Sequence, residues 1–367
     1  MHKKKSTESD LPTYIRISNE IREKYIRHAS AEEMLPSIVA LAEEFSVSKA
    51  TAERAVKLLA NAGDLYSLNG SGTYVRMKQQ AVDGTALSRI CVLAPINFHD
   101  PANWYSNALF RGISERAMSL GISMQIVAGK KKAVMQEIAS GGMLQSESCG
   151  FIVLISVKEN ADPLIDTLNE FQRRIVLVES TAYKSKVLTA SVDNRTGIIN
   201  ACKHLKSLSR TKTIFIGSSA ESGGLMQRKN AFIEAFRNTG ITAQDERIIL
   251  SGVNDFSPDI RRGYLLMDGY SKARGFSFDS IIAANDGFAA GCILSLKERG
   301  VKIPEDVAVI GFDDQTRLTE GFVPSITSVR FDAVELGRKA VRTLVTGIEE
   351  NMIPTELICR ESAPKII

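Results

Sequence analysis

From Arg89 onward, short apolar segments rich in β-branched residues alternate with longer segments that carry apolar residues at helical spacing. The segments with strand character are 90–96, 122–128, 151–156, 175–179, 213–217, 247–250, 280–284 and 307–311. The segments with helix character lie near 107–120, 131–140, 161–171, 196–208, 225–238, 258–271 and 287–299. This alternation predicts an α/β fold of parallel sheets covered by helices on both faces. It runs for about 275 residues, more than one compact sheet holds, and therefore predicts two doubly wound lobes.

The preceding segment, 41–75, carries two short helices joined by a sharp turn. Residues 41–45 end one amphipathic helix, and the Ser48 hydroxyl is placed to cap the next one. That second helix is expected over residues 49–62 and ends at Gly63. Its apolar face consists of Ala52, Ala55, Val56, Leu59 and Ala62. Its opposite face consists of Lys49, Ala50, Glu53, Arg54 and Lys57. Such a helix packs on one side and is exposed on the other.

A β-hairpin follows these helices. Residues 65–68 and 73–75 alternate like strands, and Asn69-Gly70-Ser71-Gly72 between them is a strong turn signal. Two helices and a hairpin form a winged helix-turn-helix, whose second helix fits a DNA major groove. Core packing alone would also explain two amphipathic helices, but the small residues at the helix start and the glycine hairpin favour DNA binding. The predicted DNA contacts are Ser48, Lys49, Ala50, Thr51, Arg54, Lys57, Asn69, Gly70, Ser71 and Gly72.

Five motifs are spread over this head in a fixed order. They are Pro12-Thr13-Tyr14, Leu35-Pro36-Ser37, Val47-Ser48-Lys49-Ala50-Thr51, Leu58-Leu59-Ala60-Asn61-Ala62-Gly63 and Gly70-Ser71-Gly72-Thr73-Tyr74-Val75. Together they resemble the GntR family of bacterial transcription regulators. Two departures concern cations: Ile38-Val39-Ala40 stand where the family usually has a phosphate-binding basic residue, and the family's Arg-Glu order is Glu53-Arg54 here. The second change moves a cation by about 100° around the helix, so the operator sequence does not carry over from the family.

Composition and cysteine usage predict a cytoplasmic protein that does not contact membranes. The net charge of +4 is too small to predict nucleic-acid binding by itself. The five cysteines are scattered without paired spacing, which suits reduced thiols. The basic N-terminus is not followed by the apolar stretch of a signal peptide, and the chain has no run of about 18 apolar residues.

Motifs of enzymes and metal sites are missing from the sequence. No Gly-x-Gly-x-x-Gly follows a strand, and the glycine-rich residues 217–224 lack the Gly-Lys-Ser/Thr of a phosphate loop. The four histidines are isolated and show no metal-ligand spacing. We therefore expect no enzymatic activity, no cofactor and no metal.

A second set of motifs lies in the α/β region. They are Val192-Asp193-Asn194, Arg228-Lys229-Asn230-Ala231-Phe232, Ala284-Asn285-Asp286, Gly300, Ile303-Pro304-Glu305-Asp306-Val307, Gly311-Phe312-Asp313-Asp314 and Pro324-Ser325-Ile326-Thr327. Essentially all of residues 89–367 resembles the effector domain of the LacI/GalR repressors. The resemblance implies two periplasmic-binding-protein-like lobes, joined by three crossovers, with a ligand in the cleft. The pairing with a GntR-type head resembles the arabinose repressors of Gram-positive bacteria.

The resemblance also implies which residues bind the effector. Arg228, Asn285 and Asp313 match positions that hold it from the second lobe. The candidates from the first lobe, Trp104 and Tyr105, follow from their place in the loop after the first strand, where an aromatic pair could also serve packing alone. The predicted effector contacts are Trp104, Tyr105, Ser156, Glu179, Asp193, Arg228, Asn285, Asp286 and Asp313. Guanidinium and carboxylate groups suit vicinal hydroxyls, whereas a purine would favour two aromatic rings around it. A monosaccharide is therefore expected.

Some of these residues also have structural interpretations. Asp313 could cap the turn after its strand, Arg228 could be a solvated helix residue, and Asn285 or Asp286 could cap the following helix. The sequence leaves these alternatives open.

The domain prediction follows from these motifs. The head is expected over residues 10–77, a linker over 78–88, and an effector-binding and dimerisation domain over 89–367. The two lobes are expected to divide that domain as 89–190 plus 314–328, and 191–313 plus 329–360.

The predicted function is that of a dimeric transcription repressor that binds an inverted-repeat operator and is released by a small sugar. One alternative is a regulator whose nucleoside or purine corepressor strengthens DNA binding. Another is a solute-binding protein, which the head disfavours.

Overall fold

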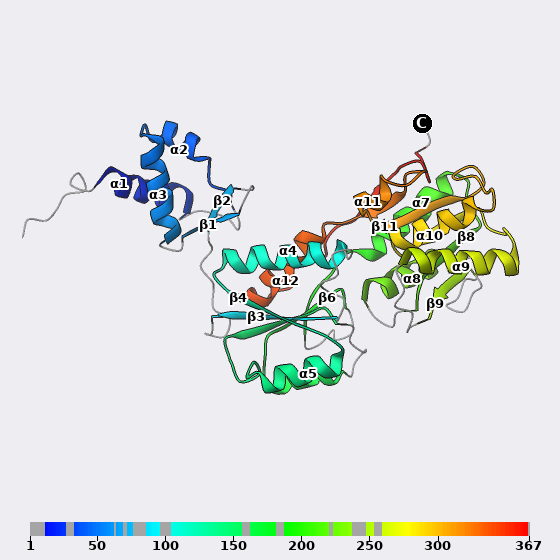
Figure 1. Ribbon diagram of the computed structural model, residues 1–367, viewed down its shortest axis with the longest axis horizontal. Coiled ribbons are helices and arrows are strands. Elements are labelled where there is room, and N and C mark those ends of the chain that lie inside the picture. Colours follow the sequence, from blue (N-terminus) through cyan, green and yellow to red (C-terminus); the bar gives the residue numbers. More distant parts are fainter. Residues whose placement is uncertain are drawn as a thin grey trace, which may run out of the picture.

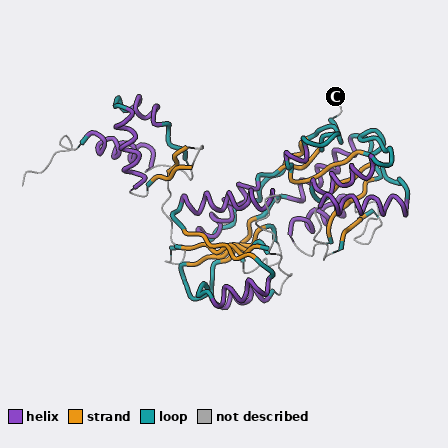
Figure 2. Tube along the Cα trace, in the orientation of Figure 1, coloured by secondary structure: helices purple, strands orange, loops and turns teal. Residues whose placement is uncertain are grey.

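The computed structural model describes residues 12–26, 33–61, 64–68, 72–75, 86–95, 104–155, 162–180, 187–219, 223–236, 247–252 and 259–365. A small N-terminal head is followed by two α/β lobes, each built around one sheet (Figures 1 and 2). This arrangement confirms the predicted fold class.

The head contains α1 (Thr13–Ile21), which continues into the short π-helix η2 (Arg22–Ile26), then α2 (Ile38–Glu44) and α3 (Lys49–Asn61). Strands β1 (Leu65–Leu68) and β2 (Gly72–Val75) pair antiparallel. Residues 33–35 extend this hairpin, because the Leu35 amide donates to the Thr73 carbonyl at 2.7 Å and the Val75 amide donates to the Glu33 carbonyl at 3.1 Å. The head has its own apolar core, made of Ile17, Ile21, Leu35, Leu41, Ala52, Ala55, Val56, Leu59, Leu65 and Val75.

The first lobe has a parallel five-stranded sheet in the order β4-β3-β5-β6-β7. Its strands are β3 (Arg89–Ala94), β4 (Ser123–Ala128), β5 (Cys149–Val153), β6 (Ile175–Val178) and β7 (Leu188–Ala190). Its helices are α4 (Trp104–Ser119), α5 (Lys131–Ser140), α6 (Pro163–Glu170) and α12 (Ala333–Thr346). Helices α4 and α12 cover one face of the sheet and α5 lies on the other (Figure 1).

The second lobe has a six-stranded sheet in the order β13-β12-β11-β10-β8-β9, parallel except for β13. Its strands are β8 (Thr213–Ser218), β9 (Ile248–Ser251), β10 (Ser280–Ala283), β11 (Ala308–Asp313), β12 (Thr327–Arg330) and β13 (Glu356–Ile358). Its helices are α7 (Asn194–Ser207), α8 (Gly223–Ala235), α9 (Asp259–Arg274), α10 (Asp286–Lys297) and the short α11 (Thr316–Thr319). Fully buried strands such as β10 and β11 explain the continuous apolar runs in the sequence.

Three segments connect the lobes: 191–193 after β7, 331–332 after β12, and 347–355 after α12. The first and third are hydrogen-bonded to each other. The Asp193 amide donates to the Ile353 carbonyl at 2.9 Å, and the Ile353 amide donates to the Ser191 carbonyl at 2.9 Å. Three crossovers were expected, and these are their positions.

The predicted division of the C-terminal part between the lobes is wrong. Residues 314–328 belong to the second lobe rather than the first, because β12 pairs parallel with β11. Within 329–360, α12 belongs to the first lobe, because its apolar face packs on α4 and on strands β5 to β7. This packing is very close: a Cβ atom added to Gly112 of α4 would lie 1.8 Å from the Val334 carbonyl oxygen.

Candidate DNA-binding and effector-binding sites

Helix α3, the expected recognition helix, begins where the sequence predicted, whereas Ala62 and Gly63, where it was expected to end, lie outside the described residues. Its N-terminus is capped by Ser48, whose Oγ accepts from the Thr51 amide at 3.2 Å and lies 2.8 Å from the Thr51 hydroxyl. The helix buries Ala52, Ala55, Val56 and Leu59 against the head core. Its other face exposes Lys49, Ala50, Glu53, Arg54 and Lys57.

The three cations of that face, Lys49, Arg54 and Lys57, have no ion-pair partner among the described residues. They contrast with Arg22, which donates to the Asp64 carboxylate at 2.7 Å, and with Lys24, which binds Glu44 at 2.7 Å. Free exposed cations on one helix face suit phosphate and base contacts. In the wing, Gly72 begins β2, and the other predicted wing contacts, Asn69, Gly70 and Ser71, lie outside the described residues.

The predicted effector contacts that are brought together lie between the two lobes, and Arg228 of α8 is at their centre. Its Nη1 donates to Asp313 Oδ1 and to the Ala284 carbonyl, both at 2.8 Å, and its Nε donates to Asn194 Oδ1 at 2.8 Å. The guanidinium carbon lies 3.7 Å from the ring centroid of Phe312. Arg228 is therefore a buried, oriented group and not a solvated helix residue.

Glu179 reaches the same place from the end of β6 in the first lobe. Its Oε2 lies 4.0 Å from Arg228 Nη2, and its Oε1 accepts from Asn194 Nδ2 at 3.1 Å. Asn194 thus joins the two charged groups, since its oxygen faces the guanidinium and its nitrogen faces the carboxylate. The sequence marked Asn194 only as part of a motif and gave no sign of this role.

Trp104 and Tyr105 approach from the first lobe. They begin α4 rather than lying in a loop, so that part of the prediction is wrong; packing on Phe331 explains why the helix starts a turn earlier than expected. Both rings lie 6.3 Å from the Phe331 ring, which in turn lies 6.1 Å from Phe312. Phe331 lies in the connecting segment after β12 and was not predicted to be a site residue. The sequence did carry a signal of its burial, because Phe331 stands two residues after the buried Val329, as side chains on one face of a strand do.

Burial and mutual charge shift the proton affinities of this group. Burial raises the pKa of Asp313 to about 6, although Arg228 acts in the opposite direction. Burial also raises the pKa of Tyr105 well above its usual value, and the charges of Glu179, Arg228 and Asp313 all act on its hydroxyl. Tyr105, Glu179, Arg228 and Asp313 therefore form one electrostatic unit with members from both lobes.

Two other predicted residues, Asp193 and Asn285, cap helices. Asp193 caps α7, with Oδ1 accepting from the Thr196 amide at 3.0 Å. Asn285 caps α10, with Oδ1 accepting from the Phe288 amide at 3.0 Å, while its Nδ2 donates to Asp259 at 2.6 Å. The remaining candidate of this group, Ser156, lies outside the described residues.

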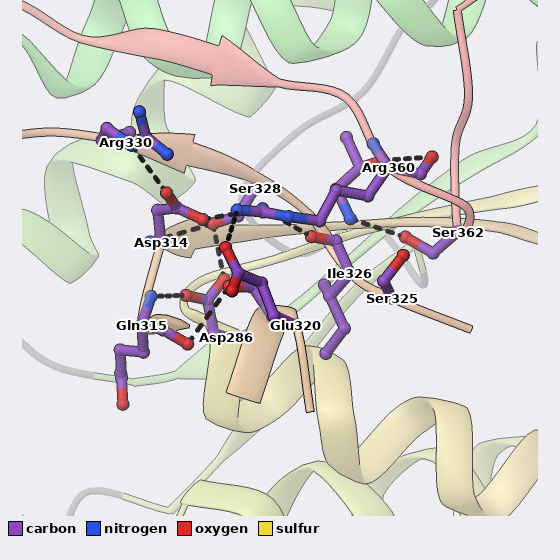
Figure 3. Close-up of polar contacts among 12 residues, drawn as sticks. Asp286, Asp314, Gln315, Glu320, Ser325, Ile326, Ser328, Arg330, Arg360 and Ser362 are labelled. Atoms are coloured by element: carbon purple, nitrogen blue, oxygen red, sulfur yellow. Dashed lines mark hydrogen bonds and ion pairs between the residues drawn. The ribbon is translucent and has the colours of Figure 1, made fainter. Parts of the chain in front are cut away.

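Asp286 is fully buried, and its role as an effector contact is a wrong prediction. Its Oδ1 accepts from the Ser328 hydroxyl at 2.6 Å and its Oδ2 from the Gln315 amide at 2.7 Å. Figure 3 shows these bonds beside those of Asp314, which binds Arg330 at 2.6 Å and Arg360 at 2.7 Å. The carboxylate of Asp286 therefore holds β12 and the start of α11 against α10.

Three further features of the described residues concern metal binding, cysteines and membranes. The described residues contain no group of histidine, cysteine, aspartate or glutamate suited to a metal ion. All five cysteines are free thiols. In the part of the chain that the structure describes, no helix has the length and apolar character needed to cross a bilayer.

Comparison with known families agrees with this division. Residues 13–75 match the bacterial regulatory proteins of the gntR family, and residues 202–363 match the periplasmic binding protein-like domain. The HTH-type transcriptional regulator DegA of Bacillus subtilis is 25% identical over 291 residues, covering 77% of this chain and 82% of DegA.

Solved structures share the fold. A transcriptional regulator CelR–cellobiose complex has a TM-score of 0.64 at 20% identity and covers 89% of this chain and 100% of its own. A LacI family regulator from Enterococcus faecium with bound ribose has a TM-score of 0.59 at 22% identity, covering 76% of this chain and 100% of its own.

One relative spans both domains. The arabinose metabolism transcriptional repressor of Geobacillus stearothermophilus is 21% identical over 377 residues, covering 98% of this chain and 100% of the repressor. The relatives are transcriptional regulators and not enzymes, in agreement with the expectation. The chain is thus a transcriptional regulator that joins a GntR-family helix-turn-helix domain to a periplasmic-binding-protein-like effector domain.

Proposed function

We propose that the protein is a dimeric repressor that leaves an inverted-repeat operator when a small sugar binds between its lobes. The observation that carries this proposal is the group of Tyr105, Glu179, Arg228 and Asp313, which draws on both lobes. A ligand that contacts all four would link the lobes, so its binding free energy would favour one relative placement of them over others.

The chemistry of this group favours a polyhydroxylated ligand. Arg228 Nη2, the Tyr105 hydroxyl and Asp313 Oδ2 make no hydrogen bond with a described residue, whereas the other polar atoms of Arg228 and Asp313 are occupied. Donors and an acceptor near aromatic rings suit a sugar, whose hydroxyls both donate and accept. Cellobiose and ribose, named with the two similar structures, and arabinose, named for the repressor of similar length, support this class.

The position of α4 supports coupling to the head. The helix starts at the interlobe group with Trp104 and Tyr105, packs on α12, and comes close to β1 of the wing (Figure 1). A winged-helix dimer must hold its two recognition helices about 34 Å apart to read two half-sites. A change in lobe placement that moves α4 would therefore disturb both half-sites together, which favours release over tighter binding.

Titration of the operator complex with sugars tests this proposal. We expect arabinose, ribose, cellobiose or a related sugar to raise the thermal midpoint of the protein and to weaken operator binding by about 1–3 kcal/mol of coupling. The same factor should appear as weaker sugar binding in the presence of operator. Stronger operator binding with the stabilising ligand would overturn release and favour a corepressor. Stabilisation by purines alone would overturn the sugar assignment.

A further inference from the structure

We propose that Glu179 sets the permitted charge of the effector, so that the interlobe site accepts uncharged and amino-bearing sugars and rejects sugars with a phosphate or carboxylate. This inference rests on the proposed function, because it concerns the same site. It adds the chemical class of ligand and the residue that selects it.

Two carboxylates, those of Asp313 and Glu179, lie against the one guanidinium of Arg228. Arg228 and Asp313 form a direct pair at 2.8 Å, with 4% and 9% of their side chains exposed. Glu179 is farther from the guanidinium, at 4.0 Å, with 12% of its side chain exposed. Arg228 is thus already matched by Asp313, and Glu179 remains as an unmatched negative charge. A ligand phosphate or carboxylate would add a like charge next to it.

The helix ends near the site do not offset this charge for an anionic ligand. A helix N-terminus is the usual backbone site for phosphate, and α8 begins here with Gly223. A Cβ atom added to Gly224 would lie 2.5 Å from Glu179 Oε2, so the carboxylate itself occupies the space at that end. The starts of α7 and α10 are capped by the side chains of Asp193 and Asn285. The ends of α7 and α10 are therefore already capped by side-chain oxygens, and at the start of α8 the Glu179 carboxylate occupies the space that a ligand anion would need.

Glu179 is held in this position from several sides. Its backbone has φ +57°, in the left-handed region, and its carbonyl accepts from Gln227 Nε2 at 3.4 Å. Asn194 Nδ2 donates to its Oε1 at 3.1 Å and to Gln227 Oε1 at 3.0 Å. A carboxylate fixed in this way does not need to be ordered by the ligand, so it acts as a preorganised partner for a cation.

The test uses the full-length protein and calorimetric titration with matched sets of probes. Each set contains a neutral sugar, its amino derivative and its terminal phosphate ester, in the glucose, galactose, ribose and arabinose series. For the wild type we expect the phosphate ester to bind at least about tenfold more weakly than the neutral sugar of the same series. The amino derivative should bind as tightly or more tightly.

The variant Glu179→Gln keeps the size of the side chain and an oxygen that can accept from Asn194, and removes only the charge. We expect it to reduce the preference for the neutral sugar over its phosphate ester by about tenfold. The preference is a ratio of two affinities measured on the same variant, so it reports the charge selection even if Glu179→Gln also changes the affinity for the neutral sugar. The matched control is Glu298→Gln at the C-terminal end of α10, where the carboxylate binds the Tyr264 hydroxyl at 2.6 Å. It makes the same change in net charge and should leave the preference unchanged.

The outcomes separate this inference from the proposed function. A wild-type protein that binds a phosphate ester as tightly as its neutral sugar would overturn the role of Glu179 but leave a sugar effector in place. So would an equal change in preference in Glu179→Gln and Glu298→Gln. Failure of every sugar to bind, charged or uncharged, would overturn the proposed function itself.

Discussion

The head and the effector domain place their functional charges in opposite environments. On α3 the cations Lys49, Arg54 and Lys57 are solvent-exposed and have no ion-pair partner among the described residues. Between the lobes, Arg228 is only 3% exposed and each of its bonded nitrogens has a defined acceptor. Exposed cations can follow an irregular DNA backbone, whereas a small ligand needs groups already held in place. The same residue type is therefore exposed and unpaired in one domain, and buried and held in place in the other.

The largest expected difference concerns stability. Arg228→Ala leaves the buried Asp313 carboxylate and the Asn194 amide without their partner, and breaking a buried pair in this way costs about 3–5 kcal/mol of unfolding free energy. Urea unfolding of the effector domain measures it. The control is Arg195→Ala on α7, whose exposed pair with Glu234 should matter little. Equal urea midpoints for Arg228→Ala and Arg195→Ala would contradict the contrast between buried and exposed charges. The buried contacts of Arg228 would then stabilise the fold no more than an exposed ion pair does.

The second effect concerns operator binding. Arg54→Ala should weaken specific operator binding by about 1–3 kcal/mol if the guanidinium reads a base edge, and should leave the unfolding midpoint unchanged. Arg16→Ala, on α1 of the same head, removes an equal charge that pairs with Glu20 and serves as the control. Fluorescence anisotropy with operator and random duplex distinguishes the two. Unchanged discrimination between the duplexes in Arg54→Ala would contradict its assignment to base recognition.

How far these sites could be predicted from sequence also differs between the domains. The exposed and buried faces of α3 follow directly from residue spacing, so the sequence was sufficient there. Arg228 and Asp313 came from motif resemblance, which identifies positions without giving their contacts. Asn285 and Asp286 are neighbours in the chain, yet only the packing of β12 decides that Asp286 faces Ser328. Asn194 was missed as a site residue because its three side-chain partners lie on other elements and no local pattern reports them.

The end of the chain was misassigned for another reason. Helix α12 carries ordinary helix signals: Asp332 caps it, Gly347 ends it in a left-handed conformation, and Leu336, Ala340 and Leu344 are buried. It was absent from the predicted helices although these signals are in the sequence. Its return to the first lobe depends on contact with α4, which is a tertiary property that spacing does not contain.

The third effect concerns pH. Burial raises the pKa of Asp313 to about 6, so the group is ionised at neutral pH and becomes protonated as the pH falls through that value. Protonation removes the charged partner of Arg228, and sugar affinity should therefore fall by up to about tenfold for each pH unit below the pKa. Calorimetry as a function of pH measures this, and Asp313→Asn should remove the dependence. A profile that is flat through pH 6 in the wild type would mean that this carboxylate is not a contact of the ligand.

The smallest effect concerns salt. If the dimer makes about six phosphate contacts, the logarithm of operator affinity should fall with the logarithm of salt concentration with a slope near −5. Lys57→Ala should make this slope less steep by about 1 for each contact that it removes, on operator and random DNA alike. An unchanged slope would mean that Lys57 does not contact a phosphate. The part of α3 that faces DNA would then be smaller than proposed.

The hydrogen bonds between the segments 191–193 and 347–355 limit how the lobes can move. Three independent connections would allow bending, twisting and sliding in any combination. Because two of them are joined through the bridge between Val192 and Ile353, they act as one ribbon, and the backbone connects the lobes at two places: this ribbon and residues 331–332. Two rigid bodies attached at two places keep one easy degree of freedom, rotation about the line through both. Ligands of different size would then move the lobes along one path and differ only in how far they move them.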